Sequence, residues 1–371
     1  MKNKIIVFGF VMILLSFFTA TVLLEDRDYS EMENRYLTQK PEFTWKSLLS
    51  GEYMDQFEKY MADQIAGKDG LVSLKTDVEL LLQRQGTGGV YFGKKGQYVK
   101  DYQPDEETYE QNLGFLRSFV DTYKEQYRMA FVLAPNVQSV YTDVLPADIV
   151  MGDADADREK AKKQFSDIIF VDPTEKLQEH KKEYLYFKTD HHWTMRGAYY
   201  GYQALAEEMK WDTMKLSDYD MEICSDSFYG SLYSKAPLSW AKKDKIEAFY
   251  NVLGKYRVTF EDGSHINSLF LSSNLYGKDK YTYFLDGNHA FCKIQSNAGT
   301  KKKALVFKDS YSHVLLPFLA DQYDQIDVVD LRYYRNDIEE LLKEGGYDDI
   351  LFIYNIDFLT SDENFIWLDF K

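Results

Sequence analysis

The segment from Phe187 to Leu205, FKTDHHWTMRGAYYGYQAL, places an acid, two histidines and a tryptophan in a row (190–193), directly before a helical pattern. The whole chain has 6 histidines, and two of them stand here. Aspartate beside histidine can form the acid–base half of a nucleophilic site, hold a metal ion, or simply satisfy polar groups beside a helix cap. The rest of the sequence decides among these three.

A serine, Ser310, follows the apolar run Ala304–Phe307 at the point where a strand is expected to turn into a helix. A helix N-terminus supplies free N–H groups and a partial positive charge, which favour a developing oxyanion. Serine is also a good N-cap, so the same position is compatible with a purely structural role. Ser312 and His313 are weaker nucleophile candidates, because they lie further into the expected helix.

Serine needs a base to become a nucleophile, and histidine is the usual one near neutral pH. Residues two apart in an extended segment face the same side, so we expect Asp190 and His192 to lie on one face. The carboxylate of Asp190 then orients the imidazole of His192 toward Ser310, which gives the acid, base and nucleophile of a hydrolase triad. By the same alternation, His191 is expected to point away.

Two other interpretations of the acid–histidine row stay open. In the first, Asp190 or Thr194 caps the helix that begins after Met195, and the histidines are satisfied polar groups. In the second, the row ligates a metal ion in a phosphoesterase. Adjacent histidines rarely reach one ion, and no further His or acid cluster stands at ligand spacing, so we expect no metal and no cofactor.

Two more polar side chains follow predicted strands. Arg332 follows Ile326–Leu331, and Asn355 follows Ile350–Tyr354. The carboxyl ends of parallel strands meet at one edge of a sheet, which is where sites form in such folds. Asn355 and Arg332 are therefore predicted to be donors to an oxyanion or to a substrate carbonyl.

The elements that position these residues alternate between apolar strand-like runs and helical patterns, which predicts an α/β fold with a parallel sheet covered by helices. Residues about 215–300 interrupt the alternation with short β-like pieces such as KYRVTF and YTYFL, and predict a β-rich insertion. The segment 105–126 and the stretches HVLLPFLADQ and DIEELLKEGG predict helices, and GVYFGKKGQYV predicts a hairpin. The expected strands are Met129–Ala134, Ile168–Val171, Ala304–Phe307, Ile326–Leu331 and Ile350–Tyr354.

The N-terminal part predicts an anchor and a stalk. The run Ile5–Leu24 carries no charge, is long enough to cross a bilayer, and is preceded by two lysines and followed by two acids. We therefore expect residues 1–26 to be a signal-anchor transmembrane helix, with a cleaved signal peptide as the alternative. Residues 27–85 predict a polar, membrane-proximal helical segment. The main domain is expected over 86–371, outside the cell membrane.

The composition excludes some partners and leaves others open. A formal charge of −16 argues against nucleic acid, because phosphate binding needs a positive surface. Aromatic residues make up 16% of the chain, with 30 tyrosines, which suits both ordinary packing and sugar rings. The two cysteines, Cys224 and Cys292, are too few for a disulfide scaffold, and sequence alone does not show whether they pair.

These motifs together resemble a known group of proteins. Lys308-Asp309-Ser310 after a strand resembles the G-D-S block of SGNH hydrolases, and Asp190 to Trp193 resembles the D-x-H-W motif of the bacterial alginate O-acetylation proteins AlgJ and AlgX. The letters D-H-H-W also name a related family of exported bacterial proteins. The resemblance extends over most of residues 30–360, including ENRYLTQKPEF and LAPNVQSVYTDVLP.

The resemblance implies a three-layer α/β/α SGNH-like fold that is circularly permuted, since the serine block follows the aspartate–histidine block. It implies a serine-dependent O-acetyltransferase or acetylesterase that acts on a cell-envelope or secreted polysaccharide, beside a membrane-bound O-acyltransferase as partner. It also gives Asn355 the place of the oxyanion-hole asparagine. Lys308 departs from the usual glycine. That departure supports the alternative of a non-catalytic carbohydrate-binding or scaffold protein of a modification or export complex.

Overall fold

The structure is a computed structural model and describes residues 2–369. The chain divides into two compact units. The first contains the residues up to Gly88 together with Tyr233–Ala241, and the second contains Gly89–Leu232 together with the residues from Lys242 onward.

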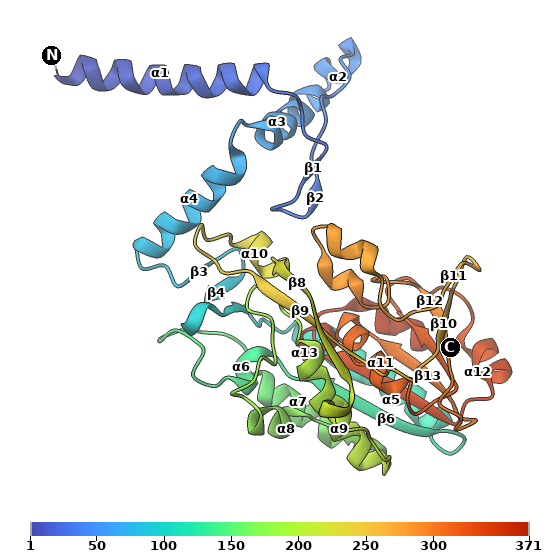
Figure 1. The fold of residues 1–371 in the computed structure, drawn as a ribbon. Coiled ribbons are helices and arrows are strands. Elements are labelled where there is room, and N and C mark those ends of the chain that lie inside the picture. Colours follow the sequence, from blue (N-terminus) through green and yellow to red (C-terminus); the bar gives the residue numbers. More distant parts are fainter. Residues whose placement is uncertain (1, 370–371) are drawn as a thin grey trace. The chain divides into compact units, whose positions relative to one another are not determined.

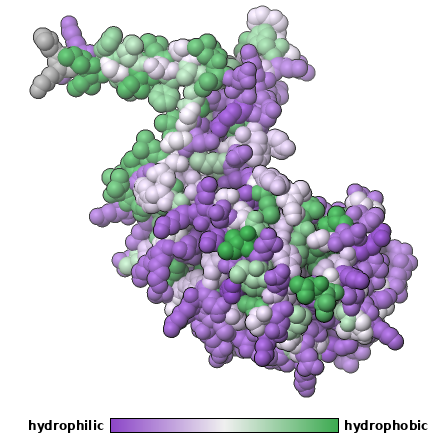
Figure 2. Space-filling model, in the orientation of Figure 1, coloured by the Kyte–Doolittle hydropathy of each residue, from purple (hydrophilic) through white to green (hydrophobic). Residues whose placement is uncertain are grey.

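The first unit begins with α1 (Lys2–Leu23), whose apolar side chains are exposed along the helix (Figures 1 and 2). It is long and apolar enough to cross a membrane, and a signal sequence near an N-terminus has the same properties. The predicted N-terminal apolar helix is confirmed. The unit's further elements are β1 (Tyr29–Ser30), β2 (Arg35–Tyr36), α2 (Trp45–Leu49), α3 (Glu52–Gln64), α4 (Lys68–Leu81) and β3 (Gly86–Thr87).

The second unit is built on an eight-stranded sheet in the order β11-β10-β12-β14-β13-β15-β6-β7 (Figure 1). The strands from β14 to β7 are parallel, which confirms the predicted parallel sheet. Their bounds lie within two residues of the predicted runs: β6 (Arg128–Ala134), β7 (Ile169–Val171), β13 (Lys303–Lys308), β14 (Gln325–Val329) and β15 (Asp349–Asn355).

Helices cover both faces of this sheet, because its central strands are apolar on both sides. In β13, Ala304 and Val306 belong to the core cluster that contains α9 (Met195–Met209). Leu305 and Phe307 belong to the opposite cluster, with α5 (Glu106–Tyr123) and α12 (Ile338–Gly345). The predicted α/β class is confirmed. The other helices are α6 (Val137–Val140), α7 (Ala154–Gln164), α8 (Thr174–Glu179), α10 (Ser231–Lys235), α11 (Leu316–Leu319) and α13 (Ile356–Leu359).

The segment predicted as an insertion differs from expectation in one respect. Part of it extends the central sheet, since β12 (Phe291–Ser296) pairs antiparallel with β14, and β10 (Tyr256–Phe260) and β11 (His265–Ile266) continue outward. A separate ladder joins β8 (Asp220–Phe228) and β9 (Asp244–Tyr250). The stretch YTYFL is not a strand, because its first three residues belong to the 3-10 helix η4 (Lys280–Tyr283), which buries Tyr281 and Tyr283.

The predicted hairpin is present, with β4 (Val90–Phe92) and β5 (Tyr98–Lys100) joined across η1 (Lys94–Gly96). The stretch HVLLPFLADQ forms two short turns, η5 (Ser310–Val314) and α11, rather than one helix. Proline at the start of α11 has no N–H to continue the preceding turn. The remaining 3-10 turns are η2 (Leu216–Asp218), η3 (Ser272–Tyr276) and η6 (Glu363–Leu368). Both cysteines are free thiols.

Candidate active site

A tight bend, here called the histidine bend (residues 186–193), carries the acid and both histidines. An isolated bridge between Tyr186 and Trp193 closes it. Inside the bend, the His192 N–H donates to Asp190 Oδ1 at 3.0 Å. The bend therefore holds the carboxylate and the second imidazole against each other through its own backbone. Thr194 caps α9 by accepting the Gly197 N–H, so Asp190 is not needed as the cap.

The structure brings three of the predicted site residues into one hydrogen-bonded array. His192 Nδ1 lies 2.6 Å from Asp190 Oδ1, and His192 Nε2 lies 2.7 Å from Ser310 Oγ. Asp190 and His192 are buried, whereas Ser310 is partly exposed and reachable from solvent. The order carboxylate, imidazole, hydroxyl is that of a nucleophilic triad.

Asp190 is held as a carboxylate by the histidines of the bend and by a backbone N–H from outside it. Its second oxygen accepts the Ser231 N–H at 2.7 Å. Burial alone raises the pKa of Asp190, but the imidazoles of His191 and His192 and the Ser231 N–H outweigh burial and hold it well below its usual value. Gly230 makes this approach possible, because a Cβ there would stand 2.2 Å from Asp190 Cβ. The acid therefore stays charged and able to orient the imidazole.

The nucleophile candidate begins a short turn, here called the serine turn (residues 309–314), at the end of β13. Asp309 caps the turn, with Oδ1 accepting the Tyr311 N–H at 2.8 Å and Oδ2 accepting the Asn355 N–H at 2.7 Å. Complete burial raises the pKa of Asp309 to about 6, although these two N–H groups oppose the shift. Asp309 thus joins the ends of β13 and β15 and fixes the backbone next to Ser310.

Trp193 ties the histidine bend to the serine turn. It is fully buried, and its indole N–H donates to the Tyr311 carbonyl at 2.8 Å. Gly201 makes room for the ring, since a Cβ there would lie 2.8 Å from Trp193 Cη2. Trp193, the last residue of the Asp190–Trp193 row, therefore has a positioning role that composition and spacing did not indicate.

We expect Trp193→Phe to destabilise the folded chain by about 1–3 kcal/mol, because the buried Tyr311 carbonyl loses its indole donor. Chemical denaturation of the full chain in detergent measures the free energy of unfolding. The exposed tryptophan Trp240 provides the matched control. Trp240→Phe should change the free energy of unfolding by less than about 0.5 kcal/mol. Equal effects of the two substitutions would contradict the positioning role.

Tyr281, from η4, was missed by sequence reasoning. Its ring stacks on His192 with centroids 3.9 Å apart and planes 8° apart, and its hydroxyl donates to the Ser310 carbonyl at 2.9 Å. On its other side it stacks with His313. Burial raises the pKa of Tyr281 well above its usual value, so the ring is neutral. Only the high aromatic content of the chain hinted at such a contact.

The lysine that replaces the usual glycine does not interrupt the array. Lys308 is buried, and its Nζ lies 2.8 Å from His313 Nε2 and 2.9 Å from Asp330 Oδ2. Burial, followed by the charge of Lys308, lowers the pKa of His313 well below its usual value. His313 is thus a neutral partner of Lys308, and the Lys308 ammonium donates to His313 and Asp330 rather than to His192 or Ser310.

The structure does not direct Asn355 and Arg332 toward Ser310 as the sequence suggested. Both amide hydrogens of Asn355 are used, since Nδ2 donates to the Ala134 carbonyl at 3.0 Å and to Asn136 Oδ1 at 3.1 Å. Its Oδ1 caps α13. Arg332 binds Asp330 through two nitrogens, at 2.8 and 2.6 Å. Both residues follow strands at the carboxyl edge of the sheet, as predicted, but hydrogen bonds to neighbouring groups engage their side chains.

Asn136, two residues beyond the end of β6, is a donor that sequence reasoning missed. Its Nδ2 is buried and has no hydrogen-bond partner among the described residues. Its Oδ1 accepts from Asn355, whose own N–H reaches Asp309, the neighbour of Ser310. An unsatisfied buried donor is costly, so such a group beside a site suggests a ligand acceptor.

His191 does not follow the predicted alternation. The histidine bend is not extended, so His191 does not face the opposite side. Its Nδ1 lies 2.8 Å from Ser231 Oγ and 3.6 Å from the same Asp190 oxygen that His192 binds. It remains partly exposed, and the contact with Ser310 Oγ is made by His192 Nε2. The expectation that His192 is the histidine that contacts Ser310 holds, although the stated reason for it is wrong.

Ligand atoms of Asp190, His191 and His192 lie within 4.8 Å of one another, so this row has the spacing of a possible cation site. Its chemistry fits a proton relay better. Both ring nitrogens of His192 already face hydrogen-bond partners, and the Asp190–His192 row contains a single carboxylate. A metal would have to displace Ser310 or the Asp190 contact.

The family model described as DHHW protein matches residues 112–329. A DHHW family protein from Eubacterium siraeum superposes with a TM-score of 0.66 at 22% identity, over 76% of this chain and 95% of that one. Bacillus cereus PatB1 gives a TM-score of 0.63 at 22% identity, over 75% and 98%. PatB1 with a sulfonyl adduct gives 0.61 at 20% identity, over 74% and 97%.

No curated protein matches the chain significantly. At these identities the solved structures establish the shared fold. The match to the family model covers more than half of the chain, from within α5 to the end of β14. The Asp190–Trp193 row lies inside that span, as does Ser310.

Proposed function

Since the chain belongs to the DHHW protein family, we propose that it is an exported serine-dependent acyltransferase or esterase that moves an acetyl group on or off a cell-envelope or secreted polysaccharide. The observation that supports this most strongly is the continuous array from Asp190 through His192 to Ser310, with contacts of 2.6 and 2.7 Å. The resemblance of the row to the motif of the alginate O-acetylation proteins supports acetyl as the group.

In the proposed reaction, Ser310 Oγ attacks the carbonyl carbon of an acyl ester and passes its proton to His192 Nε2. The bond between the carbonyl carbon and the donor oxygen breaks, and His192 returns the proton to that oxygen. This leaves an acyl-serine. A sugar hydroxyl or water then attacks the acyl carbon and gives its proton to His192. The bond between the acyl carbon and Ser310 Oγ breaks, and His192 returns the proton to Oγ, which restores the serine. Asp190 holds the imidazole in the correct tautomer throughout.

We further propose that Asn136, rather than Asn355, donates its side-chain amide to the oxyanion, with the Ser310 N–H as the second donor. Removing one preorganised donor costs on the order of 100- to 1,000-fold in turnover. Asn136→Asp keeps the acceptor for Asn355 and removes the donor, so it should lower kcat by about this factor and change KM little. Steady-state hydrolysis of a chromogenic acetyl ester measures both constants.

The matched variant is Asn355→Ala, which removes the cap of α13 and two buried hydrogen bonds. Its expected effect is a loss of about 0.5–2 kcal/mol in the free energy of unfolding. A folded Asn355→Ala protein with a large kcat loss, beside an active Asn136→Asp protein, would return the oxyanion role to Asn355.

The proposed location is the outer side of the membrane, with α1 as a single-pass signal-anchor. This orientation is supported by the length of the uncharged run Ile5–Leu24, by the two lysines before it and by the two acids after it. A membrane-bound O-acyltransferase that supplies the acyl group from the inner side is the proposed partner, and it rests on the resemblance alone.

Activity on the chromogenic acetyl ester should survive chelation. The array needs no ion to activate Ser310, and both nitrogens of His192 are already engaged. The rate is measured after incubation with EDTA and again after divalent metal is added back. Loss of activity on chelation that is restored by metal would support the phosphoesterase alternative, since Asp190, His191 and His192 have ligand spacing.

The proposal as a whole is tested with a sulfonyl fluoride probe, chosen because a PatB1 structure contains a sulfonyl adduct. The expected result is one modified serine, Ser310, identified by peptide mass spectrometry, with parallel loss of esterase activity. Ser312, buried in the same serine turn, is the internal comparison. A chain whose Ser310 is not modified, and which shows no esterase activity, would favour the scaffold alternative.

A further inference from the structure

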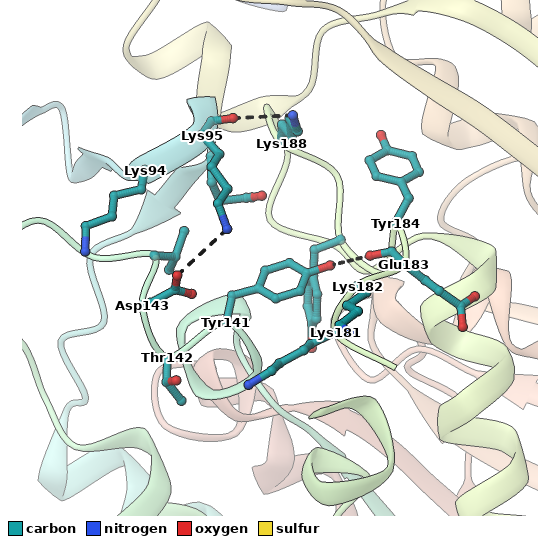
Figure 3. Close-up of a pocket in the computed structure, with 13 residues that line it drawn as sticks. Lys94, Lys95, Tyr141, Thr142, Asp143, Lys181, Lys182, Glu183, Tyr184 and Lys188 are labelled. Atoms are coloured by element: carbon teal, nitrogen blue, oxygen red, sulfur yellow. Dashed lines mark hydrogen bonds and ion pairs between the residues drawn. The ribbon is translucent and has the colours of Figure 1, made fainter. Parts of the chain in front are cut away.

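A pocket of about 600 Å³ lies in the second unit, and none of Asp190, His192 and Ser310 lines it. Its walls come from three separate stretches of chain: the turn between β4 and β5, the loop after α6, and residues 181–188, which include the start of the histidine bend. Five lysines line it, which is unusual for a chain with a formal charge of −16. They are Lys94, Lys95, Lys181, Lys182 and Lys188 (Figure 3).

Most of this positive charge is not neutralised by the protein. Lys94, Lys181 and Lys182 are exposed and form no ion pair within residues 2–369. Lys95 approaches Asp143 only at 3.8 Å, with both side chains largely exposed, which is a weak interaction. Figure 3 shows the Lys95 side chain directed toward Asp143.

The second acid at the pocket does not balance the lysines. The Glu183 carboxylate binds His180 at 2.9 Å, Arg196 at 3.3 Å and the Tyr200 hydroxyl at 2.8 Å. Figure 3 shows it directed away from Lys181 and Lys95. The pocket therefore retains a net positive potential against an acidic background, which concentrates anionic ligands.

The pocket wall also includes ring surfaces. Tyr141 and Tyr184 are partly exposed, and their hydroxyls are already bonded inside, to the Glu183 carbonyl and to Asp244. What they offer the pocket is the flat ring, which suits the apolar face of a sugar. Flat rings beside ammonium groups are suited to an anionic sugar unit rather than to an inorganic ion alone.

The pocket is joined to the array through the backbone. Lys188 stands two residues before Asp190, so their backbones are at most about 7 Å apart. The Lys188 carbonyl accepts the Tyr98 N–H at 2.7 Å, and the Phe187 carbonyl accepts from Gln97 at 2.7 Å. One rigid segment thus forms the wall of the pocket and the start of the histidine bend.

We propose that this lysine pocket is a binding subsite for an anionic unit, carboxylate or phosphate, of a glycan polymer. The inference rests on the proposed function in one respect, because it identifies that polymer as the substrate class. The pocket binds the charged unit of the polymer, and the acyl chemistry takes place at Ser310.

The test measures binding of the full chain in detergent by isothermal titration calorimetry. Two probes distinguish the source of the charge, an oligogalacturonate for carboxylate and a poly(glycerol phosphate) oligomer for phosphate, with a neutral dextran oligomer as the comparison. The double variant Lys181→Gln/Lys182→Gln should weaken binding of at least one anionic probe by about tenfold or more at low salt, and salt should weaken wild-type binding. Lys301→Gln/Lys302→Gln, an adjacent pair outside the pocket, is the matched control.

Equal weakening by both pairs, no binding of either anionic probe, or equally tight binding of dextran would each overturn the proposal. Hydrolysis of a small acetyl ester separates this outcome from failure of the proposed function. The Lys181→Gln/Lys182→Gln protein should retain the wild-type rate on that ester. Conversely, Ser310→Ala should retain polymer binding. Loss of the Ser310 chemistry and loss of the subsite are therefore seen in different variants and different assays.

Discussion

Ser310→Ala is expected to reduce the hydrolysis of a chromogenic acetyl ester by about 10⁴- to 10⁶-fold, the range found when a triad nucleophile is removed. The physical reason is that no other hydroxyl takes its place. Ser312 is fully buried, and its hydroxyl donates to the Asp309 carbonyl. The rate measured with purified full-length protein, compared with the uncatalysed rate, gives the effect.

Ser312→Ala is the control for this substitution, since it removes a hydroxyl from the same serine turn. Its expected effect is a change in stability from one lost hydrogen bond, about 0.5–1.5 kcal/mol, with kcat reduced by less than about tenfold. A Ser310→Ala protein that keeps more than about a tenth of wild-type activity would contradict the nucleophile assignment.

The second large effect is expected at the histidine bend. His192→Ala should reduce kcat about as much as Ser310→Ala, and the double variant should be no worse than either, because the residues act as a unit. Asp190→Asn should cost on the order of 10⁴-fold, because an amide at that position favours the wrong tautomer of His192. Each rate is measured on the same ester, with circular dichroism to establish that the protein is folded.

His191→Ala is the matched control in this case, one residue from His192 and of the same chemistry. It loses a 2.8 Å contact with Ser231 Oγ, while the contact between His192 and Ser310 is kept, so its expected cost is about tenfold or less. If His191→Ala were as inactive as His192→Ala, the row would act as a paired-histidine site, and the proton relay through His192 alone would be wrong.

The sequence predicted the parallel strands well, because each is a short apolar run that is buried on both faces. Phe307 and Val306 illustrate this, since they lie in opposite core clusters. YTYFL was predicted as a strand because aromatic and β-branched residues favour strands, yet tertiary packing of Tyr281 against His192 selects a 3-10 turn. Local propensity could not anticipate a contact with a residue so far away in the chain.

For the site, too, the residues found by local sequence signals were predicted, and those that depend on tertiary contacts were not. Ser310, His192 and Asp190 were found from residue types and strand ends, which are local signals. The direction of a side chain such as that of Asn355 depends on neighbours that sequence does not reveal, here Ala134 and Asn136. His191 was placed on the wrong side because a bend closed by a Tyr186–Trp193 bridge breaks the two-residue alternation of an extended strand.

Rapid-quench peptide mass spectrometry of the wild-type chain during turnover of an aryl acetate tests the central claim most directly. The account predicts one acetyl group on the peptide that contains Ser310, formed faster than steady-state turnover and absent from the Ser310→Ala protein. An acetyl group on another residue that forms and decays at the turnover rate, or steady turnover with no acetylated peptide, would contradict it.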